Sequence, residues 1–133
     1  MDNLERNNDV AENATTPWGY MISIDAGGCD LDKISSAENI KNFSNTLVER
    51  IDMVKFGEPW IVRFGNLNSN KFGYTLVQLI STSNICAHFS EEECSIYFDC
   101  FSCKPFSNET VKQTVIEFFG ATSIKEHFIT RQA

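Results

Sequence analysis

Two short segments of the chain hold side chains suited to covalent chemistry. Residues 81–88 read Ser-Thr-Ser-Asn-Ile-Cys-Ala-His, which sets a hydroxyl nucleophile at Ser83 and an imidazole at His88. Residues 99–103 read Asp-Cys-Phe-Ser-Cys and end on the thiol of Cys103. A serine hydroxyl can attack the carbonyl of the preceding residue when a base for its α-proton and donors for the oxyanion are present. His88 is a suitable base because imidazole titrates near neutral pH.

Each of these side chains also has an ordinary structural explanation. A lone Ser83 is typical of a turn, and a lone His88 is typical of a half-buried position in a strand. A free cysteine such as Cys103 is most often a small core residue. The chemical hypothesis therefore depends on the combination of residue types and spacings, and not on any one residue.

Hydrophobic periodicity predicts the elements that position these residues. Helical spacing predicts one helix from a Ser35-x-x-Glu38 capping box to near Val54, and a second from Ser107 to Gly120. Strand patterns cover residues 18–25, 60–64, 72–80, 85–89, 95–103 and 124–130. Short links between the middle strands require antiparallel pairing. We therefore predict an α+β fold, a two-layer α/β sandwich with an antiparallel sheet and two helices on one face. The exposed sheet face needs a partner or polar side chains.

Composition indicates one packed domain. The chain has 133 residues, of which 42% are apolar, and it includes 11 phenylalanines. Residues 1–16 are predicted to be a flexible polar tail, and residues 17–133 a single domain. The net charge of −7 without a basic cluster argues against nucleic acid as a partner. The sequence contains no apolar run of membrane-spanning length and no signal peptide, so a cytoplasmic protein is expected.

The cysteines are expected to be reduced thiols. Their number, five, is odd, and no secretion signal precedes them. Cys100 and Cys103 form a C-x-x-C pair, which is typical of zinc or redox sites. A structural zinc site needs four ligands, and no second pair exists. Positions three apart in a strand also point to opposite faces. We therefore expect no metal, with metal binding by this pair as the secondary hypothesis.

Around these motifs, residues 73–106 resemble the bacterial-type S-adenosylmethionine decarboxylase family, and a weaker likeness extends over residues 18–133. In that family the cleavage serine precedes the processing histidine by five residues, as Ser83 precedes His88. A second hydroxyl stands eight residues before the cleavage serine, at Thr75. The catalytic cysteine follows a D-x-F-T/S-C pattern and corresponds to Cys103. Residues 28–30, Gly-Cys-Asp, also match a family feature.

The resemblance implies an enzyme that makes its own cofactor. The chain would cleave itself after Thr82 into a β chain, 1–82, and an α chain, 83–133, and Ser83 would become a pyruvoyl group. That group forms a Schiff base with the substrate amine and accepts electrons as carbon dioxide leaves, after which Cys103 reprotonates the product. The family also implies a homodimer and a place in polyamine (spermidine) biosynthesis. Pyridoxal phosphate is not expected, because no glycine-rich phosphate loop with a nearby lysine is present.

Three positions depart from the family pattern. Thr82 replaces a glutamate, Asn84 a histidine, and Ser90 an aromatic residue that helps to hold adenine. Stacking on an aromatic side chain is worth ~1–3 kcal/mol per base in single-strand binders. Phe89 is adjacent but should point to the other face of the strand. The sequence thus leaves S-adenosylmethionine, by family, beside L-ornithine or L-arginine as substrates. A third alternative is an uncleaved, non-catalytic binding or regulatory homologue.

Acidic side chains are candidates to meet the distal positive charge of such a substrate. Asp99 is also placed to tune Cys103 if the two share a face. Most carboxylates of an acidic protein only solvate its surface, which is the alternative explanation for each of them. The candidates are Asp25, Asp30, Glu91, Asp99 and Glu126.

Overall fold

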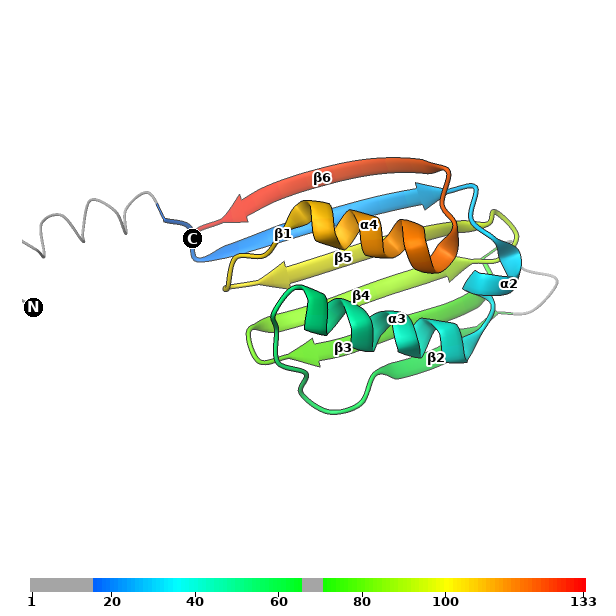
Figure 1. Cartoon of the computed structure of the whole chain (residues 1–133), viewed down its shortest axis with the longest axis horizontal. Helices are drawn as coiled ribbons and strands as arrows, with labels where there is room; N and C mark the ends of the chain where they lie inside the picture. The colour runs from blue at the N-terminus through cyan, green and yellow to red at the C-terminus, as the bar shows by residue number, and fades with distance from the viewer. Residues whose placement is uncertain (1–15, 66–70) are drawn as a thin grey trace, which may run out of the picture.

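The computed structural model describes residues 16–65 and 71–133, and it contains two layers (Figure 1). The predicted tail, apart from Thr16, lies outside the described residues, as does part of the predicted turn at 65–70. One layer is a six-stranded antiparallel sheet and the other is formed by helices, which confirms the α+β sandwich. The elements are β1 (Gly19–Gly27), α2 (Leu31–Ile34), α3 (Ala37–Arg50), β2 (Trp60–Phe64), β3 (Gly73–Ile80), β4 (Ser83–Ser90), β5 (Ser95–Ser102), α4 (Asn108–Phe119) and β6 (Ser123–Arg131).

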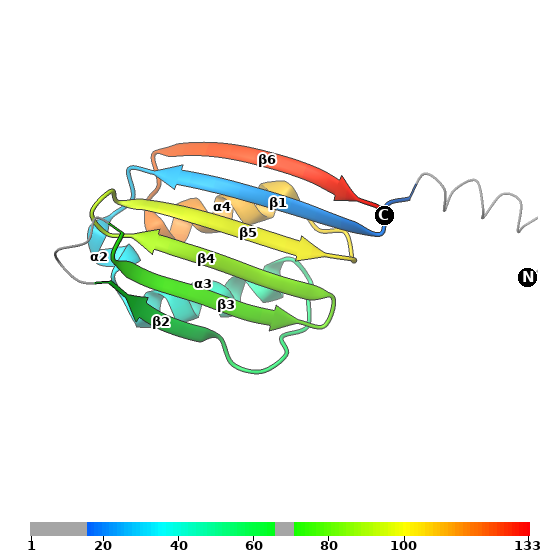
Figure 2. The ribbon, with the colours of Figure 1, turned by 180° about the vertical axis from the view of Figure 1, so that it is seen from behind.

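The sheet has the strand order β2-β3-β4-β5-β1-β6. Strands β2 to β5 follow one another as hairpins, and β1 lies between β5 and β6. Helix α3 lies on the path from β1 to the far edge strand β2, and α4 connects β5 to β6. Both helices cover the same face, and within the described residues the other face carries no helix (Figures 1 and 2). We call this uncovered surface the open face.

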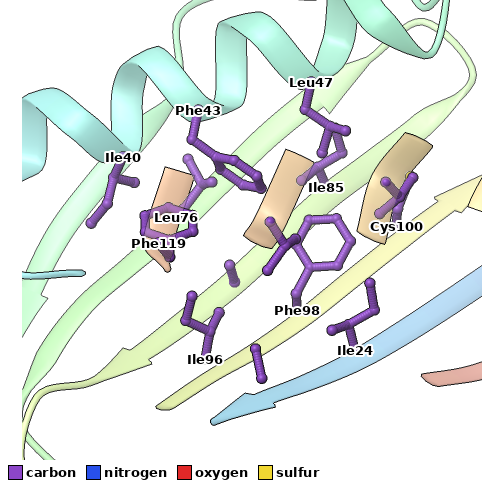
Figure 3. Close-up of a cluster of buried hydrophobic side chains, with 14 of the residues drawn as sticks. Ile24, Ile40, Phe43, Leu47, Leu76, Ile85, Ile96, Phe98, Cys100 and Phe119 are labelled. Atoms are coloured by element: carbon purple, nitrogen blue, oxygen red, sulfur yellow. The ribbon is translucent and has the colours of Figure 1, made fainter. Parts of the chain in front are cut away.

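The core lies between the helices and the sheet (Figure 3). Phe43 of α3 is at its centre, because its ring contacts Phe98 of β5 and Phe119 of α4 edge-on, with ring centroids 6.0 Å and 4.8 Å away. Every second residue of the central strands points into this core, as the period of a strand requires. On β4 the inward residues are Ile85 and Ala87, each with no exposed surface.

Helix boundaries differ from the prediction at two points. Helix α3 begins one residue later than expected, because Ser36 accepts the Asn39 N–H at 3.1 Å. The predicted cap, Ser35, instead ends α2, a one-turn helix that the sequence analysis missed, and its hydroxyl donates to the Leu31 carbonyl. Helix α3 ends at Arg50, before the predicted Val54, and two residues later Asp52 adopts the left-handed conformation (φ 58°), which cannot continue a helix. Helix α4 has the predicted bounds, with Ser107 as its cap and Gly120 (φ 66°) after its end.

The open face carries a large amount of apolar surface. Strand pairing puts the side chains of Trp60, Phe64 and Leu79 on it, and they are 69%, 55% and 50% exposed. Ile129, at the other edge of the sheet, is 52% exposed. Exposed apolar surface of this kind is typical of interaction sites. Within the two described ranges, no helix has the length and apolar character needed to cross a membrane.

Candidate functional site

The bond between Thr82 and Ser83 lies at the tip of the hairpin that joins β3 to β4. Ile80 pairs with Ser83, so Ser81 and Thr82 form a two-residue turn. Neither turn residue has a positive φ, so the turn is not of the primed type that matches strand twist. Ser83 is half-buried, and it alternates in phase with the inward residue Ile85. The nucleophile predicted from the sequence is therefore the first residue of β4, directly after this turn.

The carbonyl that Ser83 would attack already has a hydrogen-bond donor. The backbone N–H of Cys103, just beyond β5, donates to the Thr82 carbonyl oxygen at 3.1 Å. A preorganised N–H aimed at an attacked carbonyl polarises it and stabilises the oxyanion that develops. The structure thus brings Thr82, Ser83 and Cys103 together, from segments twenty residues apart in the sequence.

The Thr82 side chain is held as well. The Ser102 hydroxyl donates to the Thr82 hydroxyl oxygen at 2.7 Å, and the Thr82 hydroxyl faces the Met53 sulfur at 3.3 Å. Ser102 itself accepts the Lys104 backbone N–H at 3.0 Å. Ser102 has no exposed surface and is the direct cross-strand partner of Ser83. Sequence analysis missed Ser102, although it occupies the T/S position of the D-x-F-T/S-C pattern.

The second predicted pair lies farther along the sheet. Thr75 of β3 and His88 of β4 are cross-strand neighbours, and the Thr75 hydroxyl lies 3.0 Å from His88 Nδ1. Both side chains point to the open face. They line a pocket of about 440 Å³ together with Phe64, Tyr74, Ser90, Glu93 and Tyr97.

This pocket contains one further polar pair. The Tyr97 hydroxyl donates to a Glu93 carboxylate oxygen at 3.1 Å, and this hydrogen bond, with the charge of Glu93, raises the pKa of Tyr97. The Ser90 hydroxyl has no hydrogen-bond partner among the described residues. Phe89 packs inward against Phe119, with ring centroids 5.1 Å apart, as strand alternation predicted. Phe89 is thus among the residues around this pocket, but its ring is buried against Phe119, and position 90 carries no ring.

The structure does not bring His88 to Ser83 within one chain. Five residues of β4 separate them, and a strand rises about 3.3 Å per residue, so the separation is about 16 Å. The two side chains also alternate to opposite faces of the sheet. General-base catalysis needs hydrogen-bond reach of about 3 Å or one intervening water. A role for His88 at Ser83 thus requires a second copy of the chain.

Three of the acidic candidates are already paired with cations. Asp30 lies 3.4 Å from the Lys33 ammonium, and Glu126 lies 3.7 Å from that of Lys112. Glu91, which is 9% exposed, forms a two-pronged ion pair with Arg63, whose Nη2 lies 3.0 Å from Oε1. These carboxylates are consequently poor candidates for binding a cationic substrate.

The other two candidates face the open side of the sheet. Asp99 accepts a hydrogen bond from Ser23 at 2.6 Å, and Asp25 lines a smaller pocket of about 220 Å³ with Lys125. Asp99 shares the open face with Tyr97 and Phe101 of β5, but four residues of strand, about 13 Å, separate it from Cys103. That distance leaves little direct influence of Asp99 on the Cys103 thiol.

The five thiols lie in different environments. Burial raises the pKa of Cys29 to about 11 and that of Cys100 to about 12, and it also raises the pKa of Cys86. Cys103 is the exposed cysteine. Cys100 lies in the core, so the two cysteines of the C-x-x-C pair are on opposite sides, as expected. Across residues 16–65 and 71–133, no group of three or more potential ligands is arranged to hold a metal ion.

Comparisons with known proteins identify the family and the fold. The family model for S-adenosylmethionine decarboxylase matches residues 20–132. The chain belongs to the S-adenosylmethionine decarboxylase family. Membership indicates a decarboxylase. The fold is similar to the crystal structure of the adenosylmethionine decarboxylase from Aquifex aeolicus, with a TM-score of 0.76 and 23% sequence identity over 89% of this chain and 93% of that chain. A search of curated proteins gave no match.

Proposed function

We propose that the chain is a pyruvoyl-dependent decarboxylase that forms its cofactor by self-cleavage between Thr82 and Ser83. The observation that carries this proposal is the Cys103 N–H directed at the Thr82 carbonyl oxygen at 3.1 Å, beside the Ser83 hydroxyl. Family membership supports it, and the Thr82–Ser83 bond at the tip of a tight hairpin is accessible to the rearrangement. The residues present therefore fit a pyruvoyl group at position 83.

Cleavage needs these groups, a base and water. Ser83 Oγ bonds to the Thr82 carbonyl carbon, the C–N bond breaks, and the hydroxyl proton passes to the nitrogen, which leaves an ester and a free amine. A base then removes the Ser83 α-proton, and the Thr82 carboxylate departs to leave dehydroalanine. Water converts dehydroalanine into the pyruvoyl group and ammonia. No oxidant or reductant takes part.

The pyruvoyl group supplies the electrophilic carbonyl and electron sink that decarboxylation of an amino acid requires. Cys103, whose backbone N–H contacts Thr82, has an exposed thiol. This thiol is the group proposed to return a proton to the substrate carbon. Its exposure fits this role, because a proton donor must reach the reacting atom.

The same proposal includes a homodimer with a shared site. The Thr75–His88 pair lies about 16 Å from Ser83 of its own chain, and it points to an open face rich in exposed apolar side chains. Two sheets that pack face to face with a two-fold axis would bring the His88 end of one copy toward the Ser83 end of the other. Because the Ser83 side chain is in phase with the inward residues, His88 would approach its α-carbon from the opposite, open face. His88 of the second copy would then be the base for the α-proton.

S-adenosylmethionine is the substrate proposed from the family. A second candidate class, L-ornithine or L-arginine, is favoured by one observation on the pocket beside His88. Its lining carries the Glu93 carboxylate, and Ser90 stands where the family has an aromatic residue, although Lys71 and the aromatic residues Phe64, Tyr74 and Tyr97 also line it. Either class presents an α-amino acid with a positive charge, so the chemistry at position 83 is unchanged.

The intact mass of the denatured protein tests self-cleavage. Two fragments divided after Thr82 are expected, and the second should be lighter than a serine-started peptide by one ammonia molecule. Ser83→Ala should give one full-length mass. Ser95→Ala is the matched control, because Ser95 is also the half-buried first residue of a strand, and it should leave cleavage unchanged. A full-length mass for the unmodified chain would contradict the proposal and favour an uncleaved binding or regulatory homologue.

A further inference from the structure

Ser102, the last residue of β5, and Cys103, the next residue, each donate a hydrogen bond to Thr82. Cys103 donates its N–H to the Thr82 carbonyl oxygen at 3.1 Å, and the preceding residue, Ser102, donates its hydroxyl to the Thr82 side chain at 2.7 Å. The two donors are consecutive along the chain, and one contacts the backbone of Thr82 while the other contacts its side chain. Two anchors of this kind restrict rotation of Thr82, and with it the orientation of the carbonyl that Ser83 attacks.

The Ser102 hydroxyl is itself fixed. It accepts the Lys104 N–H at 3.0 Å and donates to the Thr82 hydroxyl oxygen at 2.7 Å, the shorter of its two donor contacts. Ser102 has no exposed surface, so bulk water cannot replace its hydroxyl. Met53, in the segment after α3, contacts both hydroxyl oxygens, at 3.3 Å from Thr82 and 3.7 Å from Ser102. These contacts therefore form a buried hydrogen-bond network around the Thr82 side chain.

We propose that Ser102 is a positioning residue for self-cleavage, and that it acts through the Thr82 hydroxyl to hold the attacked carbonyl against the Cys103 N–H. This inference rests on the proposed function. It also explains how a threonine serves at position 82, where the family pattern has glutamate, because the short threonine side chain still reaches the Ser102 hydroxyl at 2.7 Å. Ser102 also stands directly across from Ser83 in the sheet, so it lies beside the bond that breaks.

The test measures the first-order rate of cleavage in full-length chain made by a short pulse of cell-free synthesis. Ser102→Ala should cleave about tenfold more slowly, which corresponds to about 1.4 kcal/mol of activation free energy. Ser102→Thr keeps a hydroxyl and should restore most of the rate. Ser44→Ala is the matched control, because Ser44 is equally buried but bonds Gln78 away from the turn, and it should cleave at the unmodified rate.

Two further measurements separate positioning from general stability. Thr82→Val removes the partner hydroxyl, and Ser102→Ala should have little additional effect in that background, since both changes remove the same contact. Hydroxylamine, which cleaves esters, should not rescue Ser102→Ala, because the slow step precedes the ester. Rescue by hydroxylamine, multiplicative effects in the double variant, or a folded Thr82→Val chain that cleaves at the unmodified rate would each overturn the inference.

The outcome also distinguishes this inference from the proposed function. An unmodified chain that never cleaves would overturn both. An unmodified chain that cleaves, together with Ser102→Ala cleaving equally fast, would overturn only the role of Ser102. If Ser102→Ala does not fold, Thr82→Val carries the same expectation from the less buried side of the contact.

Discussion

Two chains that are each unable to cleave should restore cleavage when they are made together. His88→Ala removes the proposed base, and Ser83→Ala removes the nucleophile. Within one chain these residues lie five strand positions apart, about 16 Å, which is several times hydrogen-bond reach. Each variant is therefore expected to carry one intact half of the shared site. A mixed dimer would contain one complete site, made of Ser83 from one copy and His88 from the other.

The size of the effect follows from random pairing. When equal amounts of the two chains associate as two-fold dimers, about half of the His88→Ala chains are in mixed dimers, so about half should be cleaved. The assay is co-expression followed by intact mass, since the two variants differ in mass and each fragment can be assigned to its parent chain. The fragments should come from the His88→Ala chain alone, because the other chain lacks the nucleophile.

A matched control uses a defect on the same surface as His88. The Thr75 hydroxyl contacts His88 Nδ1 at 3.0 Å, so Thr75→Val impairs the same half of the site. Chains with Thr75→Val and His88→Ala should not complement each other, because neither copy supplies an intact pair. Absence of cleavage in the Ser83→Ala and His88→Ala mixture, with dimers present, would refute the shared site. So would efficient cleavage by a chain that sedimentation shows to be monomeric.

Three more outcomes are expected. Glu93→Gln should raise KM for L-ornithine or L-arginine about tenfold with little change in kcat, which is the loss expected for one charge-assisted contact. The control Glu49→Gln, on the exposed side of α3, should leave KM unchanged. An unchanged KM in Glu93→Gln would exclude Glu93 from cation binding. Native alkylation below pH 9 should modify Cys103 before Cys29 and Cys100, whose pKa values burial raises to about 11 and about 12. These two thiols ionise more easily in the unfolded chain, so the free energy of unfolding should fall as the pH rises above 9.0 toward about 11. A midpoint of urea unfolding that does not change with pH in this range would contradict the assigned burial.

Local sequence determined the elements and the chemical groups. The apolar periods of α3 and α4, the cap at Ser107 and Gly120 after α4 are properties of short windows, so each could be predicted without knowledge of the fold. Short links between successive strands determined antiparallel pairing for the same reason. The residue types and spacings of Ser83, His88 and Cys103 were sufficient to predict the family and the kind of chemistry.

Tertiary structure decided which of those groups meet. Sequence spacing grouped Ser83 with His88, but a strand extends by about 3.3 Å per residue and alternates its faces, so nearness in sequence along β4 became separation in space. Strand pairing did the reverse for Ser102, which lies nineteen positions from Ser83 in the chain and directly opposite it in the sheet. The register between β4 and β5 is set by burial of alternate side chains over the whole core, and no short window of sequence contains that information.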